Sequence, residues 1–396
     1  MDKQRERRAV DLPVVVLGAL GILAISLFLQ NEFDIRLSLL LLTGTGLGFA
    51  LFHGMFGFTG GWRRMIRERN SVGVRAQLLL LILSALLFFP LVGGVFSEVQ
   101  VGAALGQVGV SLLIGAFIFG IGMQLGGGCG SGTLFTVGQG QVDMLITLAF
   151  FIIGATLATS HFEWWLALPN IGSVSLIELW GWAPALLLSI AALVLLYLLV
   201  RRIELKHHGE ISSLHNQSRS DGLLEQLVYG PWPLWWSVLA LTVLGLVTLL
   251  LAGYPWSITF GFGLWGSKIW AALGGDPASW AYWSAAYPAK ALASSVLADT
   301  TSVMNIGIVL GALLAAALAG KYAPAGKISR MRLLSAVLGG LLLGYGARLA
   351  FGCNIGALLG GIASGSLHGW LWLVAAFVGG IVGVRLRIYM KLDKAY

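Results

Sequence analysis

The chain has 396 residues, of which 57% are hydrophobic and only 11% are charged, and its formal net charge is +8. Its apolar runs are about 20 residues long, the length that crosses the ~30 Å hydrocarbon core of a bilayer as a helix. This composition excludes a soluble globular protein and predicts an all-α polytopic membrane protein whose surroundings are the lipid bilayer.

The uninterrupted apolar runs predict transmembrane helices over 12–29, 37–54, 76–94, 142–160, 178–200, 234–253, 302–320 and 367–386. Three glycine-interrupted stretches, 108–139, 254–300 and 333–363, predict broken or re-entrant helices, since irregular backbone is tolerated at membrane depth only inside protein or beside a cavity. The basic segment Met1–Arg8 precedes the first run without a small-residue cleavage site. That run is therefore expected to be retained as a helix rather than removed as a signal peptide.

Basic clusters predict the orientation. Lys and Arg gather at 3–8, 63–75, 201–219, 321–332 and 385–394, which places these segments and both termini in the cytoplasm and leaves no reason to infer nucleic-acid binding. With these anchors, 108–139 and 333–363 must cross in opposite directions.

Four units are predicted along the chain. They are an N-terminal span with a periplasmic turn (1–36), a first repeat half (37–200), a polar cytoplasmic linker (201–231) and a second repeat half (232–396). His207 and His208 in the linker are expected to be solvated rather than to bind a metal.

The two cysteines align an internal repeat. From Gly115 to Gly132 and from Gly339 to Gly356, both halves read G-x4-G-x-G-x-x-L-x-x-G-C-x-x-G. Because the copies are expected to cross in opposite directions, we predict inverted repeats, a plan of many secondary transporters that places the substrate at the interface of the copies. Close helix packing by small residues is the alternative, although it does not explain the paired cysteines.

The glycine-cysteine elements mark the predicted substrate path. New half-helices are expected to begin at 130 or 131 and at 354 or 355, and their free N–H groups and partial positive charge favour a small anion. A thiol adds a weak donor or a soft contact to a sulfur-containing anion, while inert packing of both cysteines stays open. The predicted path residues are Gly57, Gln124, Gly128, Cys129, Gly130, Arg348, Gly352, Cys353 and Asn354.

Arg348 is a charged side chain in an apolar stretch, where an arginine costs ~3 kcal/mol or more at the bilayer centre unless it faces protein or water. It is either a countercharge for the anion or a side chain that reaches toward the membrane interface. Its counterpart in the first copy is Gln124. Asp143 and Asp299 are expected to cap the helices that follow them, and His53 is expected to be structural.

These residues also resemble a known family. The paired G-x-G-x-x-L-x-x-G-C elements, a third break of the type F-x-F-T before an aromatic-Arg pair, and a span start of the type D-x-T-S resemble the YeeE/YedE family of sulfur-compound (thiosulfate) transporters. The resemblance covers about residues 40–390, apart from 201–231. It implies uptake of thiosulfate or a related sulfur or selenium compound across a bacterial inner membrane, with cysteine thiols contacting the solute in sequence.

Cys129 and Cys353 match two of the thiols that the resemblance implies, and Gly57 stands where it implies a third. The resemblance also implies a small cytosolic sulfur-carrier protein as a partner, although the basic segments are expected to act mainly as topology determinants.

Other functions stay open. One alternative is that the transported anion is another sulfur or selenium compound. A second is that the same half-helix N–H donors line a passive anion channel. A membrane sulfurtransferase would need an accessible, activated cysteine, whereas both cysteines lie in apolar breaks. We expect no enzyme activity, cofactor or metal, because the chain has no G-x4-G-K-[ST] nucleotide motif and its cysteines lack metal-ligand spacing.

Overall fold

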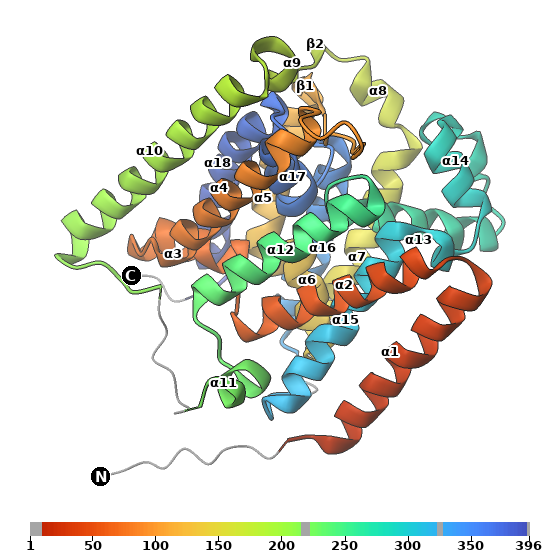
Figure 1. The fold of residues 1–396 in the computed structure, drawn as a ribbon, viewed down its shortest axis with the longest axis horizontal. Helices are drawn as coiled ribbons and strands as arrows, with labels where there is room; N and C mark the ends of the chain where they lie inside the picture. Colours follow the sequence, from red (N-terminus) through yellow and green to blue (C-terminus); the bar gives the residue numbers. More distant parts are fainter. Residues whose placement is uncertain (1–9, 215–221, 323–327, 394–396) are drawn as a thin grey trace.

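The computed structural model describes residues 10–214, 222–322 and 328–393. The basic N-terminal cluster at 3–8 and the middle of the linker lie outside these ranges. So do parts of the basic clusters at 321–332 and 385–394. The described chain is almost entirely helical (Figure 1). Within it, ten helical segments are long and apolar enough to cross a membrane, which confirms the prediction of an all-α polytopic membrane protein.

The first part of the chain contains α1 (Leu12–Glu32), α2 (Ile35–His53), α3 (Phe58–Glu68), α4 (Val72–Val92), α5 (Val110–Gly126), α6 (Gly130–Gly138), α7 (Val142–Ser160), α8 (Phe162–Leu166), α9 (Leu176–Trp180) and α10 (Trp182–His208). The second part contains α11 (Leu223–Tyr229), α12 (Leu234–Ala252), α13 (Thr259–Ala272), α14 (Ala286–Ala293), α15 (Thr300–Leu318), α16 (Arg330–Leu349), α17 (Gly360–Ala363) and α18 (Leu367–Tyr389). Shorter elements are the 3-10 turns η1 (Pro277–Ser279), η2 (Ala281–Ser284) and η3 (Val296–Ala298), and the π-helical η4 (Asn354–Leu359).

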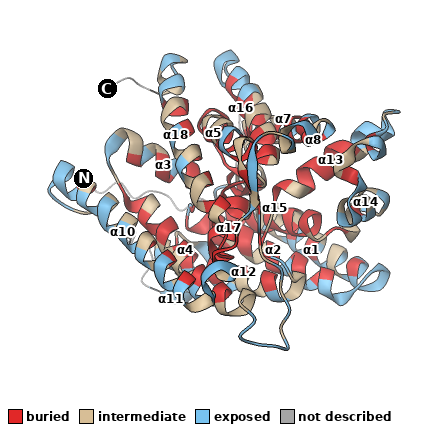
Figure 2. Cartoon of the chain, turned by 90° about the horizontal axis from the view of Figure 1, so that it is seen from above, coloured by how far each residue is buried: buried red, intermediate tan, exposed pale blue. Residues whose placement is uncertain are grey.

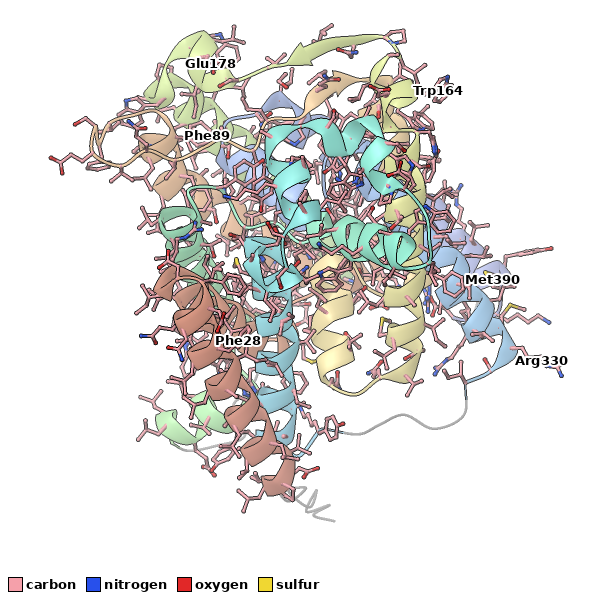
Figure 3. All side chains as sticks on the ribbon, turned by 90° about the vertical axis from the view of Figure 1, so that its right-hand side faces the viewer. Phe28, Phe89, Trp164, Glu178, Arg330 and Met390 are labelled. Carbon is pink, nitrogen blue, oxygen red and sulfur yellow. The ribbon has the colours of Figure 1, made fainter. Side chains whose placement is uncertain are left out.

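Two short strands, β1 (Gln107–Gly109) and β2 (Asn170–Ser173), pair antiparallel near α9 (Figure 1). Figure 3 shows Trp164 of α8 and Glu178 of α9 at one end of the molecule and Arg330, at the start of α16, toward the other. The long helices connect these two ends.

The outer and the central helices differ in how much apolar surface they expose. α1 and α10 lie at opposite edges of the molecule (Figure 1) and expose leucines such as Leu17 and Leu187, as lipid-facing helices do. The central helices are buried on most sides (Figure 2). There α15 packs against α2, and α16 packs against both α5 and α7.

Glycines allow the central helices to touch backbone to backbone. On α2, a β-carbon added at Gly44 or Gly48 would collide with the carbonyl oxygen of Met304 or Ile308 on α15. Gly307 and Gly311 of α15 face the α2 backbone in the same way. In lipid the hydrophobic effect does not drive helices together. Close packing at small residues stabilises such crossings instead.

We expect Gly48→Ala to destabilise the protein, because the new methyl overlaps the Ile308 carbonyl and overpacking typically costs ~1–3 kcal/mol. The measurement is the thermal unfolding midpoint of the purified protein in detergent. Gly21→Ala on α1 is the control, because a β-carbon there meets nothing within 4 Å and alanine is the better helix former. Equal unfolding midpoints for the two variants would show that α2 and α15 can move apart without loss of stability.

Two local predictions were wrong. α10 does not end near 200: it continues through Arg201 and Arg202 to His208, because these residues favour helix and the chain turns only at Gly209, whose φ is 75°. Asp143 does not cap a helix, because α7 begins one residue before it and its carboxylate lies in the first turn. Asp299 does cap α15: its Oδ2 accepts the Ser302 N–H at 2.7 Å.

Candidate functional site

Four helices begin inside the protein, each after a break in the chain. α3 follows a break after α2, α6 a break after α5, α13 a break after α12, and η4 a break after α16. The half-helices begin at Gly130 and Asn354, as the sequence predicts. Positive φ angles turn the chain at both cysteine breaks, at Gly127 (82°) and at Gly352 (148°), where glycine has no side chain to strain.

The four breaks lie against one another. A β-carbon added at Gly130 would lie 2.9 Å from the Sγ of Cys353 and 3.4 Å from Cγ2 of Ile258, the residue before α13. At the end of α5, the Nε2 of Gln124 donates to the carbonyl of Thr59 in α3 at 3.5 Å. Both cysteines are fully buried, and both thiols are free. The two glycine-cysteine elements therefore meet at one place.

Each thiol caps its own half-helix. The Gly132 N–H donates to Cys129 Sγ at 3.4 Å, and the Ile355 N–H donates to Cys353 Sγ at 3.4 Å. Oxygen-bearing side chains are the usual N-caps, and sulfur is a much weaker acceptor. Capping alone therefore does not account for cysteine at both positions.

Several buried polar atoms around the breaks have no hydrogen-bond partner within the described residues. Asn354 is fully buried, yet neither its amide nitrogen nor its amide oxygen is paired. The same holds for Thr59 Oγ1 in α3, Trp256 Nε1 before α13 and Asn305 Oδ1 in α15. Leaving such a group unpaired costs ~1–3 kcal/mol, so a polar solute or water would be stabilised here.

Sequence reasoning missed Thr59, Trp256 and Asn305 as candidate site residues. Thr59 stands in the F-x-F-T element, but nothing in the pattern distinguished a buried hydroxyl from an exposed one. Asn305 reaches the site because its Nδ2 donates to the carbonyl of Ile258 at 3.0 Å, across a long sequence separation.

Arg348 lies beside the short helix α13. Its Nη1 donates to the Tyr282 hydroxyl, and its guanidinium carbon stands 4.4 Å from the Tyr282 ring centroid. Nη2 packs against Gly263, where a β-carbon would collide with it. Nε and Nη2 are buried without a hydrogen-bond partner in the part of the chain that the structure describes. Nε and Nη2 of the Arg348 guanidinium are thus available to donate hydrogen bonds to a solute.

Gln124, near the end of α5, is fully buried. Its Oε1 accepts from Arg63 Nε at 3.0 Å, its carbonyl accepts from Arg387 Nη1 at 2.8 Å, and its Nε2 donates to the Thr59 carbonyl at 3.5 Å. Gln124 and Arg348, which the repeat aligns, therefore contact separate sets of residues.

The Gly57 break leaves room for a side chain. A β-carbon there meets nothing within 4 Å, and its φ of −132° and ψ of 131° suit any residue. His53, at the end of α2, stacks on Trp232 with ring centroids 5.7 Å apart, and its carbonyl accepts the Trp232 N–H. Among the described residues, no group of three or more His, Cys, Asp or Glu is placed to hold a metal ion.

We expect Gly57→Cys to fold normally and, for the sulfur anion that the sequence resemblance implies, to lower the KM of uptake about 2- to 10-fold, the worth of one added ~0.5–1.5 kcal/mol contact. The space beside Gly57 accepts the thiol without a clash. Labelled uptake over a range of concentrations measures this effect. Gly60→Cys is the matched control, because a β-carbon at position 60 also meets nothing within 4 Å. The same change in KM for both variants would rule out a specific role for position 57.

Comparison with known proteins adds to this geometry. A family model described as sulphur transport matches residues 53–382. The chain is 29% identical over 372 residues to a protein named thiosulfate transporter TsuA from Spirochaeta thermophila, covering 86% of this chain and 95% of that protein. It is 27% identical to the TsuA of Escherichia coli over 355 residues, covering 86% and 91%.

A shorter similarity reaches a second group of relatives. Over 164 residues, the chain is 31% identical to a probable transporter, YedE, of Escherichia coli, which covers 40% of each protein. The match to the family model includes all four helix breaks and both cysteines. The chain belongs to the sulphur-transport (YeeE/YedE) family of membrane proteins.

Proposed function

We propose that the protein imports thiosulfate, or a closely related sulfur anion, along a path between the Cys129 and Cys353 breaks. The observation that carries this proposal is the pair of buried thiols at facing helix starts, surrounded by buried polar atoms without partners. Helix N-termini stabilise an anion without a fully charged side chain at the centre. The names of the two full-length relatives support thiosulfate as the solute.

The two broken elements support an inverted repeat as the basis of the path. In both, a long helix ends in a glycine break and a thiol-capped short helix follows, α5–α6 in one and α16–η4 in the other. The basic clusters favour a bacterial inner membrane with both termini in the cytoplasm. The anion would then enter beside Arg348 and leave beside Gln124.

On the cytoplasmic side, a small sulfur-carrier protein would receive the anion. Arg64 and Arg69 at the end of α3 are exposed and offer it a positive surface. The relatives' names are those of transporters, and a transporter needs no bond-making step of its own.

Uptake of labelled thiosulfate tests the proposal. The protein is expressed in sulfur-starved cells that lack their own importers, and accumulation is compared with cells that carry the empty vector. We expect accumulation that unlabelled thiosulfate suppresses and an equal excess of chloride does not. Accumulation equal to that of the empty vector, at verified membrane abundance, would rule thiosulfate out and direct the assay to selenium and other sulfur anions.

A passive channel is distinguished by the concentration that cells reach. A channel equilibrates the anion with the membrane potential, which is negative inside and opposes entry, whereas a coupled importer accumulates it. Accumulation above the external concentration therefore favours coupled import.

A further inference from the structure

A cavity of about 700 Å³ is lined by residues of α13, of the turns η1 and η2, and of α14. Most of its lining side chains are alanine, proline and leucine, and two charged residues, Lys268 of α13 and Asp276 of the turn after α13, line it as well. None of the described residues that line it belongs to the proposed anion path. Apolar walls with a few polar groups are the usual composition of a ligand site.

The amine of Lys268 is held in place at this cavity and keeps a donor free. Its Nζ donates to the carbonyls of Leu292 and Ser294, at the end of α14, at 2.7 Å and 2.5 Å. An ammonium group has three N–H donors, so one remains for a ligand. Within the described chain, no carboxylate lies within 4.0 Å of Nζ. Asp299 attracts the amine from farther away, and both of its oxygens already accept other hydrogen bonds.

Asp276 and Trp283 add two more groups that a ligand could pair. Asp276 is exposed, and its carboxylate makes no hydrogen bond or ion pair with the rest of the described chain. Trp283 is 2% exposed, and its Nε1 has no hydrogen-bond partner among the described residues. A ligand that carries a negative group, a positive group and an acceptor oxygen would match Lys268, Asp276 and Trp283.

The surface around the cavity has the character of a lipid contact. α14 lies beside α13 at the edge of the molecule (Figure 1). Trp270 and Tyr287 are exposed there, and so are Ile269 and Leu273. Tryptophan and tyrosine rings gather at the level of the lipid head groups, and aliphatic side chains suit the acyl chains. The charged groups of the cavity are therefore next to a surface that fits a phospholipid.

We propose that this cavity binds the head group of a zwitterionic phospholipid, a phosphoethanolamine, with its phosphate on Lys268 and its ammonium on Asp276. The acyl chains lie along Ile269 and Leu273 on the surface of α13. A primary ammonium donates hydrogen bonds to a carboxylate, whereas a quaternary ammonium has no N–H to donate. The bound lipid joins the end of α13 to α14, and α13 begins at Thr259 beside the central breaks.

Native mass spectrometry of the purified protein in detergent tests this site with phosphatidylethanolamine, phosphatidylcholine and phosphatidylglycerol of identical acyl chains. We expect the wild type to bind one phosphatidylethanolamine at least about fivefold more tightly than either other lipid, because each of those lacks the charged hydrogen bond to Asp276. Asp276→Asn should remove this preference, and it breaks no side-chain contact of the described chain. Lys268→Gln should weaken the binding of all three lipids.

Two variants serve as controls. Glu98→Gln and Lys290→Gln each remove an exposed charge that does not line the cavity, and both should bind lipids as the wild type does. Equal affinity of the wild type for the three lipids, or an unchanged preference in Asp276→Asn, would contradict the proposal. Lys268 would then be a residue that only stabilises the end of α14.

Soluble glycerophosphoethanolamine separates a lipid from a free zwitterion. It carries the same head group without acyl chains, so we expect even a large excess to displace little of the bound lipid. If it binds as tightly as the lipid does, the ligand is a soluble zwitterion and the assignment to a lipid is wrong. None of these measurements uses thiosulfate, so their outcome is independent of the proposed function.

Discussion

Replacing either cysteine by serine is expected to leave the fold intact and to lower thiosulfate uptake at least ~10-fold. The two sulfur atoms accept backbone N–H groups at 3.4 Å, and a serine oxygen performs this capping at least as well. The unfolding midpoint should therefore equal that of the wild type. What serine lacks is the polarisable sulfur that a thiosulfate sulfur atom would contact beside the two breaks.

The comparison of Cys129→Ser, Cys353→Ser and the corresponding alanine variants separates three roles. A packing role predicts that serine and alanine both cost stability while uptake per folded molecule is retained. A capping role predicts that serine is normal and alanine is unstable. Our proposal predicts that all four variants lose uptake, measured at matched membrane abundance, while the serine variants keep the wild-type unfolding midpoint. Normal uptake by both serine variants would contradict it.

Replacing Arg348 by glutamine is expected to reduce thiosulfate uptake about 10- to 100-fold. Hydrogen bonds to a charged group are worth ~1.5–3 kcal/mol, and each ~1.4 kcal/mol changes binding tenfold. Arg348 holds Nε and Nη2 buried without partners while Nη1 is anchored on Tyr282, so the open donors are available to an anion. The loss should appear as a higher KM, because the interaction is made on capture of the anion.

Two further variants decide whether Arg348 acts on the anion or only on the fold. Arg348→Lys keeps the charge but not the planar fork, and an intermediate KM is expected. Tyr282→Phe removes the hydroxyl that receives Nη1 and should affect uptake less than Arg348→Gln does. If Arg348→Gln lowers the unfolding midpoint and transports with the wild-type KM, the arginine is a structural residue whose charge does not meet the solute.

Much of the architecture could be predicted from the sequence because lipid imposes strict local rules. Apolar runs of bilayer length, such as that of α1, can form only helices, since every backbone group must be paired inside the segment. The breaks were equally readable: glycines beside Cys129 and Cys353 end one helix and begin another at Gly130 and Asn354. Helix ends outside the bilayer were less predictable, as α10 shows by continuing through its charged residues to His208.

The site depended on contacts between residues far apart in the chain. The sequence by itself determined where the two thiols, one arginine within an apolar stretch and the glycine breaks lie along the chain. Only the tertiary structure decided that Gly130 faces Cys353, that Asn305 reaches the Ile258 carbonyl, and that Arg63 and Arg387 donate to the carbonyl of Gln124. The physical reason is that helix formation is a local property of the chain, whereas the satisfaction of a buried polar atom depends on whichever helix packs beside it.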